Sequence, residues 1–228
     1  MRSARIALLL ATVAPALNAQ VRDVAPYLIA DRAAEISLAR SAAPRRISDS
    51  AAVLVMTRQG YIEAAPGTNG FVCLVVRAFS GAMDTLSWAN ARVRAPHCLN
   101  AAAVRTVLPE IKLRTALVMS GAPALEVLRR TAAALTDHTL PTVIEAGAMA
   151  YMLSPRQYLV DAEPHAWQPH VMFYYNATDG SAWGAGGMDA PVIFGGAGTT
   201  NEGIVLFIPV PQWSDGTPVA TGAGAHSH

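Results

Sequence analysis

The order of structural patterns along the chain is the feature that most constrains its fold. Short apolar runs at residues 51–57, 61–65 and 70–79 are typical of strands, and the short turns between them favour antiparallel pairing. Helical patterns then cluster at residues 100–135. Four further strands are expected at residues 148–153, 170–175, 191–194 and 203–210. Strands before and after a helical block, without regular alternation, predict an α+β fold: a mainly antiparallel sheet with about three to four helices packed on one face.

The apolar spacing in the N-terminal part predicts a helix over residues 26–40. Ile29, Ala33 and Ile36 recur on one side of this helix, whereas Glu35 falls largely off that side. We therefore expect the apolar side to lie against the sheet.

Local signals also place the ends of the central helices. Asn100 is a typical N-cap residue, and Pro123 opens a helix whose core face is expected to carry Leu125 and Leu128. Residues 80–96 have no clear period and are expected to form a loop.

The first nineteen residues have the three-part pattern of a cleavable export signal. Arg2 and Arg5 form a basic start, residues 6–13 form an apolar run, and small residues follow at Ala14-Pro15-Ala16 and Leu17-Asn18-Ala19. Cleavage could follow either group, and we take 1–19 as the signal. The apolar run is too short for a membrane span of about 20 residues, so no transmembrane anchor is expected after cleavage.

Composition supports one soluble domain beyond the signal. Residues 20–215 are expected to form a single α+β domain, and the small, polar stretch 216–228 a disordered tail. The net charge of the whole chain is +1. Loss of Arg2 and Arg5 changes it to −1, which provides no electrostatic footprint for nucleic acid.

Cys73 and Cys98 are the only cysteines, and they lack metal-ligand spacing. In an exported chain such a pair predicts one disulfide. The alternative is a buried free thiol in the apolar run 71–76, since free cysteine packs as a small hydrophobic residue.

The segment 151–175 carries the densest set of chemically capable side chains. His165 and His170, with Asp161 or Glu163, are ligand types that hold zinc, manganese or copper. Their spacing matches neither a helical i, i+4 pair nor an alternate-residue strand pair, so joint coordination would require the loop to fold back. A divalent metal bound by His165, His170 and Asp161 is therefore the alternative reading, and no other cofactor is predicted.

Other chemistries lack their motifs. The sequence contains no G-x-S-x-G elbow, no dinucleotide fingerprint and no phosphate-binding loop with Gly-Lys-Ser/Thr. Catalytic residues are therefore not assigned.

Aromatic residues are more frequent in the C-terminal half, where they could line a sugar or peptide groove. We therefore expect an exported, non-catalytic binding or envelope-associated module with an aromatic-lined cleft in that half. Its partner would be a small ligand or an envelope component. The alternative is an exported hydrolase, assisted by metal at His165, His170 and Asp161.

Several stretches also resemble a group of uncharacterised exported bacterial proteins with no assigned activity. The resemblance covers most of the mature chain and implies a periplasmic or secreted location. The stretches that carry it are residues 27–40, 67–75, 147–154, 169–174 and 213–216.

Overall fold

A computed structural model describes residues 23–80, 88–162, 166–176, 181–184, 192–195 and 204–219. The expected signal, residues 1–19, lies outside these residues, as does most of the expected tail. The first residues of the expected tail, 216–219, lie against the segment that precedes them. Gln212 and Pro218 form an isolated β-bridge, and Val219 N–H donates to Pro211 O at 3.0 Å.

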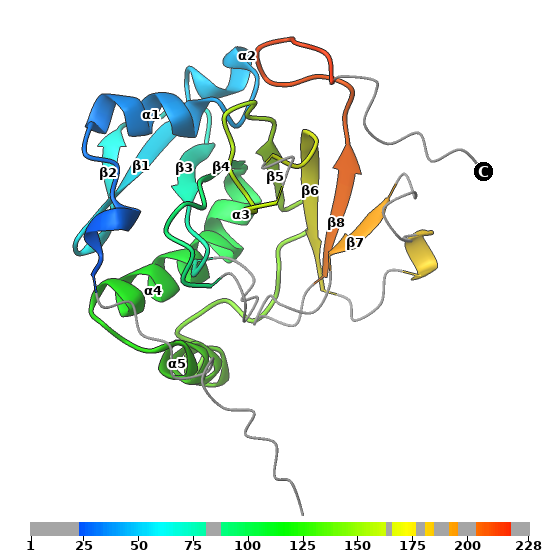
Figure 1. Cartoon of the computed structure of the whole chain (residues 1–228). Helices are drawn as coiled ribbons and strands as arrows, with labels where there is room; N and C mark the ends of the chain where they lie inside the picture. The colour runs from blue at the N-terminus through cyan, green and yellow to red at the C-terminus, as the bar shows by residue number, and fades with distance from the viewer. Residues whose placement is uncertain are drawn as a thin grey trace, which may run out of the picture.

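An eight-stranded mixed sheet forms the centre of the described structure, in the order β2-β1-β3-β4-β5-β6-β8-β7 (Figure 1). The strands are β1 (Ala52–Thr57), β2 (Gly60–Ala65), β3 (Val72–Val76), β4 (Ala95–Leu99), β5 (Met149–Met152), β6 (His170–Tyr175), β7 (Ile193–Gly195) and β8 (Ile204–Pro209). The expected α+β class is confirmed.

One pairing departs from the antiparallel rule. β1 and β2 form the expected hairpin, but β3 pairs with β1 in parallel instead of continuing from β2. Residues 66–71 cross the end of β1, where Ala52 N–H donates to Phe71 O at 2.9 Å and Thr68 N–H to Ser50 O at 2.8 Å. β2 and β3 are thus consecutive in the chain and joined by a short segment, but they are not neighbours in the sheet.

Helices cover both faces of the sheet, so the expectation of three to four helices on one face was wrong. The described residues contain five α-helices: α1 (Arg32–Arg40), α2 (Arg45–Ser48), α3 (Ala101–Thr106), α4 (Leu108–Met119) and α5 (Ala124–Thr136). They also contain two short 3-10 helices, η2 (Ala25–Tyr27) and η3 (Ser181–Trp183).

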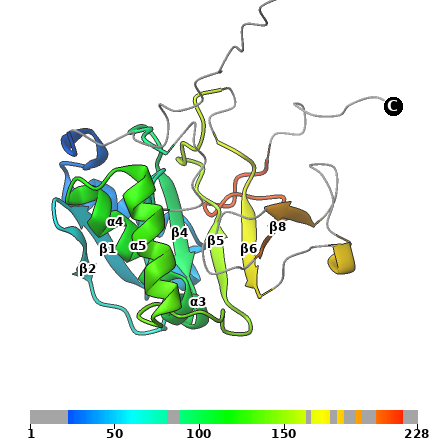
Figure 2. The same ribbon diagram turned by 90° about the horizontal axis from the view of Figure 1, so that it is seen from below.

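The residues of β3 show why two layers are needed. Leu74 and Val76 belong to the main core, which α3, α4 and α5 help to form, whereas Cys73 and Val75 belong to a second core beneath α1. Successive side chains of a strand point to opposite faces, so a strand that is apolar throughout requires cover on both sides. Figure 2 shows α4 and α5 together over one face.

The buried faces of two helices differ from their expected positions. Glu35 is 1% exposed although the apolar spacing turned it away from the sheet. In α5, Ala124, Val127 and Thr131 are buried, whereas Leu125 is 51% exposed. Glu35 becomes buried because Arg77 on the sheet side neutralises its charge, with Arg77 Nη2 2.9 Å from Glu35 Oε1.

Cys73 and Cys98 lie at disulfide-bonding distance, as expected from the sequence. They face each other directly on β3 and β4, with Cα atoms 4.0 Å apart. The cross-link joins two strands at the centre of the sheet. Among the described residues, no helix has both the length and the apolar character needed to cross a membrane.

Candidate functional site

A cavity of about 560 Å³ lies where α1, α2 and two later segments meet. These later segments are the stretch after β5 and the stretch after β8, which come together beside α2 at the upper end of the molecule in Figure 1. The lining residues are Ala33, Ile36, Ser37, Arg40, Ser41, Ala43, Arg45, Ser48, Asp49, Arg156, Ser214 and Asp215.

The lengths of α1 and α2 follow from local signals at their ends. The Asp31 side chain accepts the Ala33 N–H at 2.8 Å, which starts α1 six residues later than expected and separates it from the 3-10 turn Ala25–Tyr27. Pro44 then stands before the first residue of α2. This placement brings the end of α1 and the start of α2 to the same cavity.

Hydrogen bonds of three serines join the end of α1 to the stretches after β5 and after β8. Ser41 Oγ donates to Leu38 O at 2.6 Å, so its partner Ser154, also at 2.6 Å, must supply the proton of the bond between the two hydroxyls. Ser214 Oγ donates to Ser41 O at 2.6 Å, and its N–H donates to Leu153 O at 2.8 Å. Ser154 is fully buried, so these bonds hold the three segments together beside the cavity.

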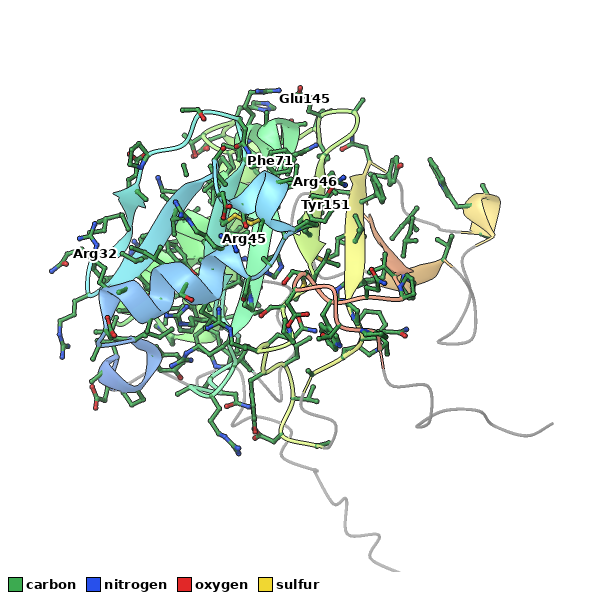
Figure 3. All side chains as sticks on the ribbon, turned by 90° about the horizontal axis from the view of Figure 1, so that it is seen from above. Arg32, Arg45, Arg46, Phe71, Glu145 and Tyr151 are labelled. Atoms are coloured by element: carbon green, nitrogen blue, oxygen red, sulfur yellow. A yellow bond between two sulfur atoms is a disulfide. The ribbon has the colours of Figure 1, made fainter. Side chains whose placement is uncertain are left out.

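Three arginines line this cavity, two from α1 and α2 and one from the stretch after β5. Arg40 is half-buried, and its Nε atom is buried without a hydrogen-bond partner among the described residues. Arg156 is exposed and donates through Nη2 to Ser37 O at 2.6 Å and to Ser37 Oγ at 3.2 Å. Arg45 is 89% exposed at its side chain, and Figure 3 shows it on α2 beside Arg46.

The acidic residues of the cavity neutralise these arginines only in part. Asp49 lies 3.5 Å from Arg45, but both side chains are more than half exposed, so water screens the pair. Hydrogen bonds from the Thr217 hydroxyl and N–H lower the pKa of Asp215, which keeps it ionised. Three guanidinium groups therefore stand against two carboxylates at this site.

Such an arrangement is suited to holding an anion. Guanidinium N–H groups match the oxygens of carboxylate and phosphate groups, and serine hydroxyls can add further donors. Among the residues that the structure describes, no histidine or lysine lines the cavity.

Two of the proposed metal ligands, Asp161 and His170, lie in different environments. Asp161 is exposed, accepts the Tyr158 hydroxyl at 2.9 Å and lies 3.3 Å from Arg92 Nη1. His170 is 1% exposed and packs against Trp167 and Phe207, with ring centroids 4.5 Å and 5.3 Å away. His165 and Glu163 lie outside the described residues.

A metal at His165, His170 and Asp161 stays a prediction. Among the residues that the structure describes, no three His, Cys, Asp or Glu side chains gather in a way that could hold a metal ion.

The expected aromatic-lined cleft also stays a prediction. Trp167 packs in a cluster with His170 and Phe207, and Trp183, which is 48% exposed, stacks on Tyr175 with ring centroids 4.4 Å apart. None of the residues that line the described cavity is aromatic.

The arginine cavity was missed at the sequence level because its parts are far apart. Arg40, Arg156 and Ser214 lie together only in the folded structure, and no spacing rule connects them. The available signal was the density of arginine around Pro44, at positions 40, 45 and 46.

Comparison with known proteins gives no relative: no family model, curated protein or solved structure matches this chain.

Proposed function

We propose that this chain is an exported, non-catalytic binding module whose cavity holds a small ligand bearing a carboxylate or phosphate group. The observation that carries the proposal is the buried, unpartnered Nε of Arg40 at a cavity with two further arginines. A buried guanidinium N–H without an acceptor costs free energy, and an anionic ligand that displaced the atoms covering Arg40 Nε would supply that acceptor.

The dimensions of the cavity support a small ligand. Its volume of about 560 Å³ falls within the range of known small-molecule sites. Ile36 and two alanines add apolar surface next to the charged groups, so the ligand should carry an apolar portion beside its anionic group. The proposal keeps the binding role expected from the sequence, but it places the ligand in the arginine-lined cavity and not in an aromatic-lined cleft.

Export is part of the same proposal. It is supported by the basic, apolar and small-residue pattern of residues 1–19, and it is compatible with the cysteine pair at disulfide distance. A periplasmic or secreted ligand of low molecular weight would then reach the cavity without crossing the inner membrane.

Calorimetric titration with inorganic phosphate, succinate and hexanoate tests the binding proposal. We expect saturable binding of at least one of these anions, weakened about tenfold or more in Arg40→Met and in Arg156→Met. Arg46→Met is the matched control, because Arg46 is an exposed arginine of α2 that does not line the cavity.

Two outcomes would contradict the proposal. Equal weakening in Arg46→Met would mean that the anions respond to general surface charge. Absence of saturable binding by all three anions at low ionic strength would remove the case for an anion site.

A further inference from the structure

A second group of residues lies in one row across three neighbouring strands, away from the arginine cavity. β5 and β6 pair Met152 with His170, and β4 and β5 pair Cys98 with Tyr151. Continuing the β4–β5 register by one residue brings His97 opposite Met152. Residues directly opposite in antiparallel strands point to the same face, so His97, Met152 and His170 share a face. Figure 1 shows β4, β5 and β6 side by side.

The two imidazoles of this row are held in the same way. Nδ1 of His97 lies 2.8 Å from Ala95 O, and Nδ1 of His170 lies 2.8 Å from Gln168 O. A carbonyl oxygen only accepts, so each Nδ1 carries the hydrogen and each Nε2 presents a lone pair. Metal-binding histidines characteristically donate their other ring N–H to a carbonyl or carboxylate in this manner.

The Nε2 of His170 lacks a protein partner. Its side chain is 1% exposed, and the buried Nε2 makes no hydrogen bond among the described residues. Packing against Trp167 and Phe207 shields the ring from water. A buried acceptor without a hydrogen-bond partner calls for an explanation, and a bound metal ion is one explanation.

The electrostatics of the row favour neutral ligands. Burial is the main cause that lowers the pKa of both histidines to about 4, and charge repulsion from His170 contributes to the lowered pKa of His97. The two rings therefore lie within electrostatic range of each other, and both are unprotonated at neutral pH. Histidine must be neutral to bind a metal, so no proton has to be displaced.

We propose that Nε2 of His97, Nε2 of His170 and Sδ of Met152 form a site for Cu(I). The thioether is a soft ligand that selects Cu(I), imidazole also binds copper, and the row contains no carboxylate of the kind that calcium or magnesium prefers. Two strand spacings place the outer Cα atoms about 10 Å apart, and an ion above the middle strand lies within reach of side chains from both sides. Met152, 5% exposed, stands at that middle position.

Anaerobic titration of the full chain with Cu(I), against a chromogenic competing chelator, tests this site. The chain should carry His226→Ala and His228→Ala, because the terminal histidines could chelate metal weakly. We expect one equivalent of Cu(I), with affinity reduced about 100-fold or more in His97→Gln and in His170→Gln.

Met152→Leu provides the decisive variant because it conserves volume and should preserve the fold. Loss of the thioether should weaken Cu(I) about tenfold and leave the weaker affinity for Zn²⁺ within about twofold. Circular dichroism and the unfolding midpoint would verify that each variant is folded. His138→Asn, which changes an exposed histidine outside the row, should leave Cu(I) binding intact.

Three results would overturn the proposal. They are absence of stoichiometric Cu(I) uptake, unchanged Cu(I) affinity in Met152→Leu, and loss of binding in Asp161→Ala or His165→Ala. The last result would assign the ion to the ligand set expected from the sequence. None of the three bears on the arginine cavity, which shares no residue with this row.

Discussion

Breaking the buried ion pair between Glu35 and Arg77 should destabilise the fold severely. The pair joins α1 to the residue after β3, with side chains 1% and 0% exposed and 2.9 Å between Glu35 Oε1 and Arg77 Nη2. Arg77 also donates to Tyr27 O at 2.8 Å and to Val75 O, and Glu35 accepts the Met56 N–H at 3.2 Å. One guanidinium therefore joins α1, the N-terminal segment and the sheet.

Arg77→Met would leave the Glu35 carboxylate and two carbonyls buried with fewer partners. Removing one member of a buried ion pair costs about 3 to 5 kcal/mol. For a domain of this size each kcal/mol changes the melting temperature by about 2 to 4 °C, so we expect a decrease of roughly 6 to 20 °C. Calorimetry and urea unfolding would measure it.

Two further variants make the reasoning refutable. Arg129→Met removes an ion pair of similar length, 2.8 Å to Glu126, whose arginine side chain is 65% exposed, and it should change the midpoint little. Glu35→Leu combined with Arg77→Met should be more stable than Arg77→Met alone, because no unpaired charge stays buried. Equal effects of Arg77→Met and Arg129→Met would refute the claim that burial sets the cost.

Three other predictions concern stability. His97 and His170 have pKa values of about 4 in the native state, whereas a histidine in the unfolded chain has its ordinary pKa of about 6.5. Below pH 6.5 the unfolded chain therefore binds more protons than the native state, and the free energy of unfolding should fall between pH 6.5 and 4, by on the order of 3 kcal/mol per histidine. Denaturant midpoints against pH would show it, and a flat profile would refute it. Reducing the bond between Cys73 and Cys98, which are separated by 25 residues, should cost about 3.5 kcal/mol in the chain-entropy model, measured by urea unfolding with and without reductant. Ser154→Ala should cost about 1 kcal/mol in the same assay, because the part-buried Ser41 hydroxyl and the Arg156 N–H each lose a partner; an unchanged midpoint would contradict the serine network.

Local signals predicted several elements closely. Asn100 caps α3 as expected, with its side chain accepting the Ala103 N–H at 3.0 Å, and Pro123 precedes α5. Caps and prolines act on neighbours within one helical turn, so a short stretch of sequence is sufficient to recognise them.

β4 was missed because its sequence does not resemble a strand. Residues 80–96 were expected to be a loop, and Pro96 and His97 interrupt the apolar pattern of Ala95–Leu99. The segment nevertheless pairs with β3 on one side and β5 on the other. Pairing on two sides outweighs weak local preference, because strand propensity depends strongly on neighbours.

The sequence by itself determined the α+β class, the central helices, the hairpin at Gly60 and the cysteine pair. Each depends on periodicity, on caps and turns, or on a count of two cysteines, all of which can be recognised without long-range contacts. The tertiary structure alone decided that Glu35 would be buried, that helices would cover both faces, and that Arg40, Arg156 and Ser214 would meet. Such meetings depend on which strands pair and on which polar groups find partners, and those interactions join residues that are 42 to 173 positions apart.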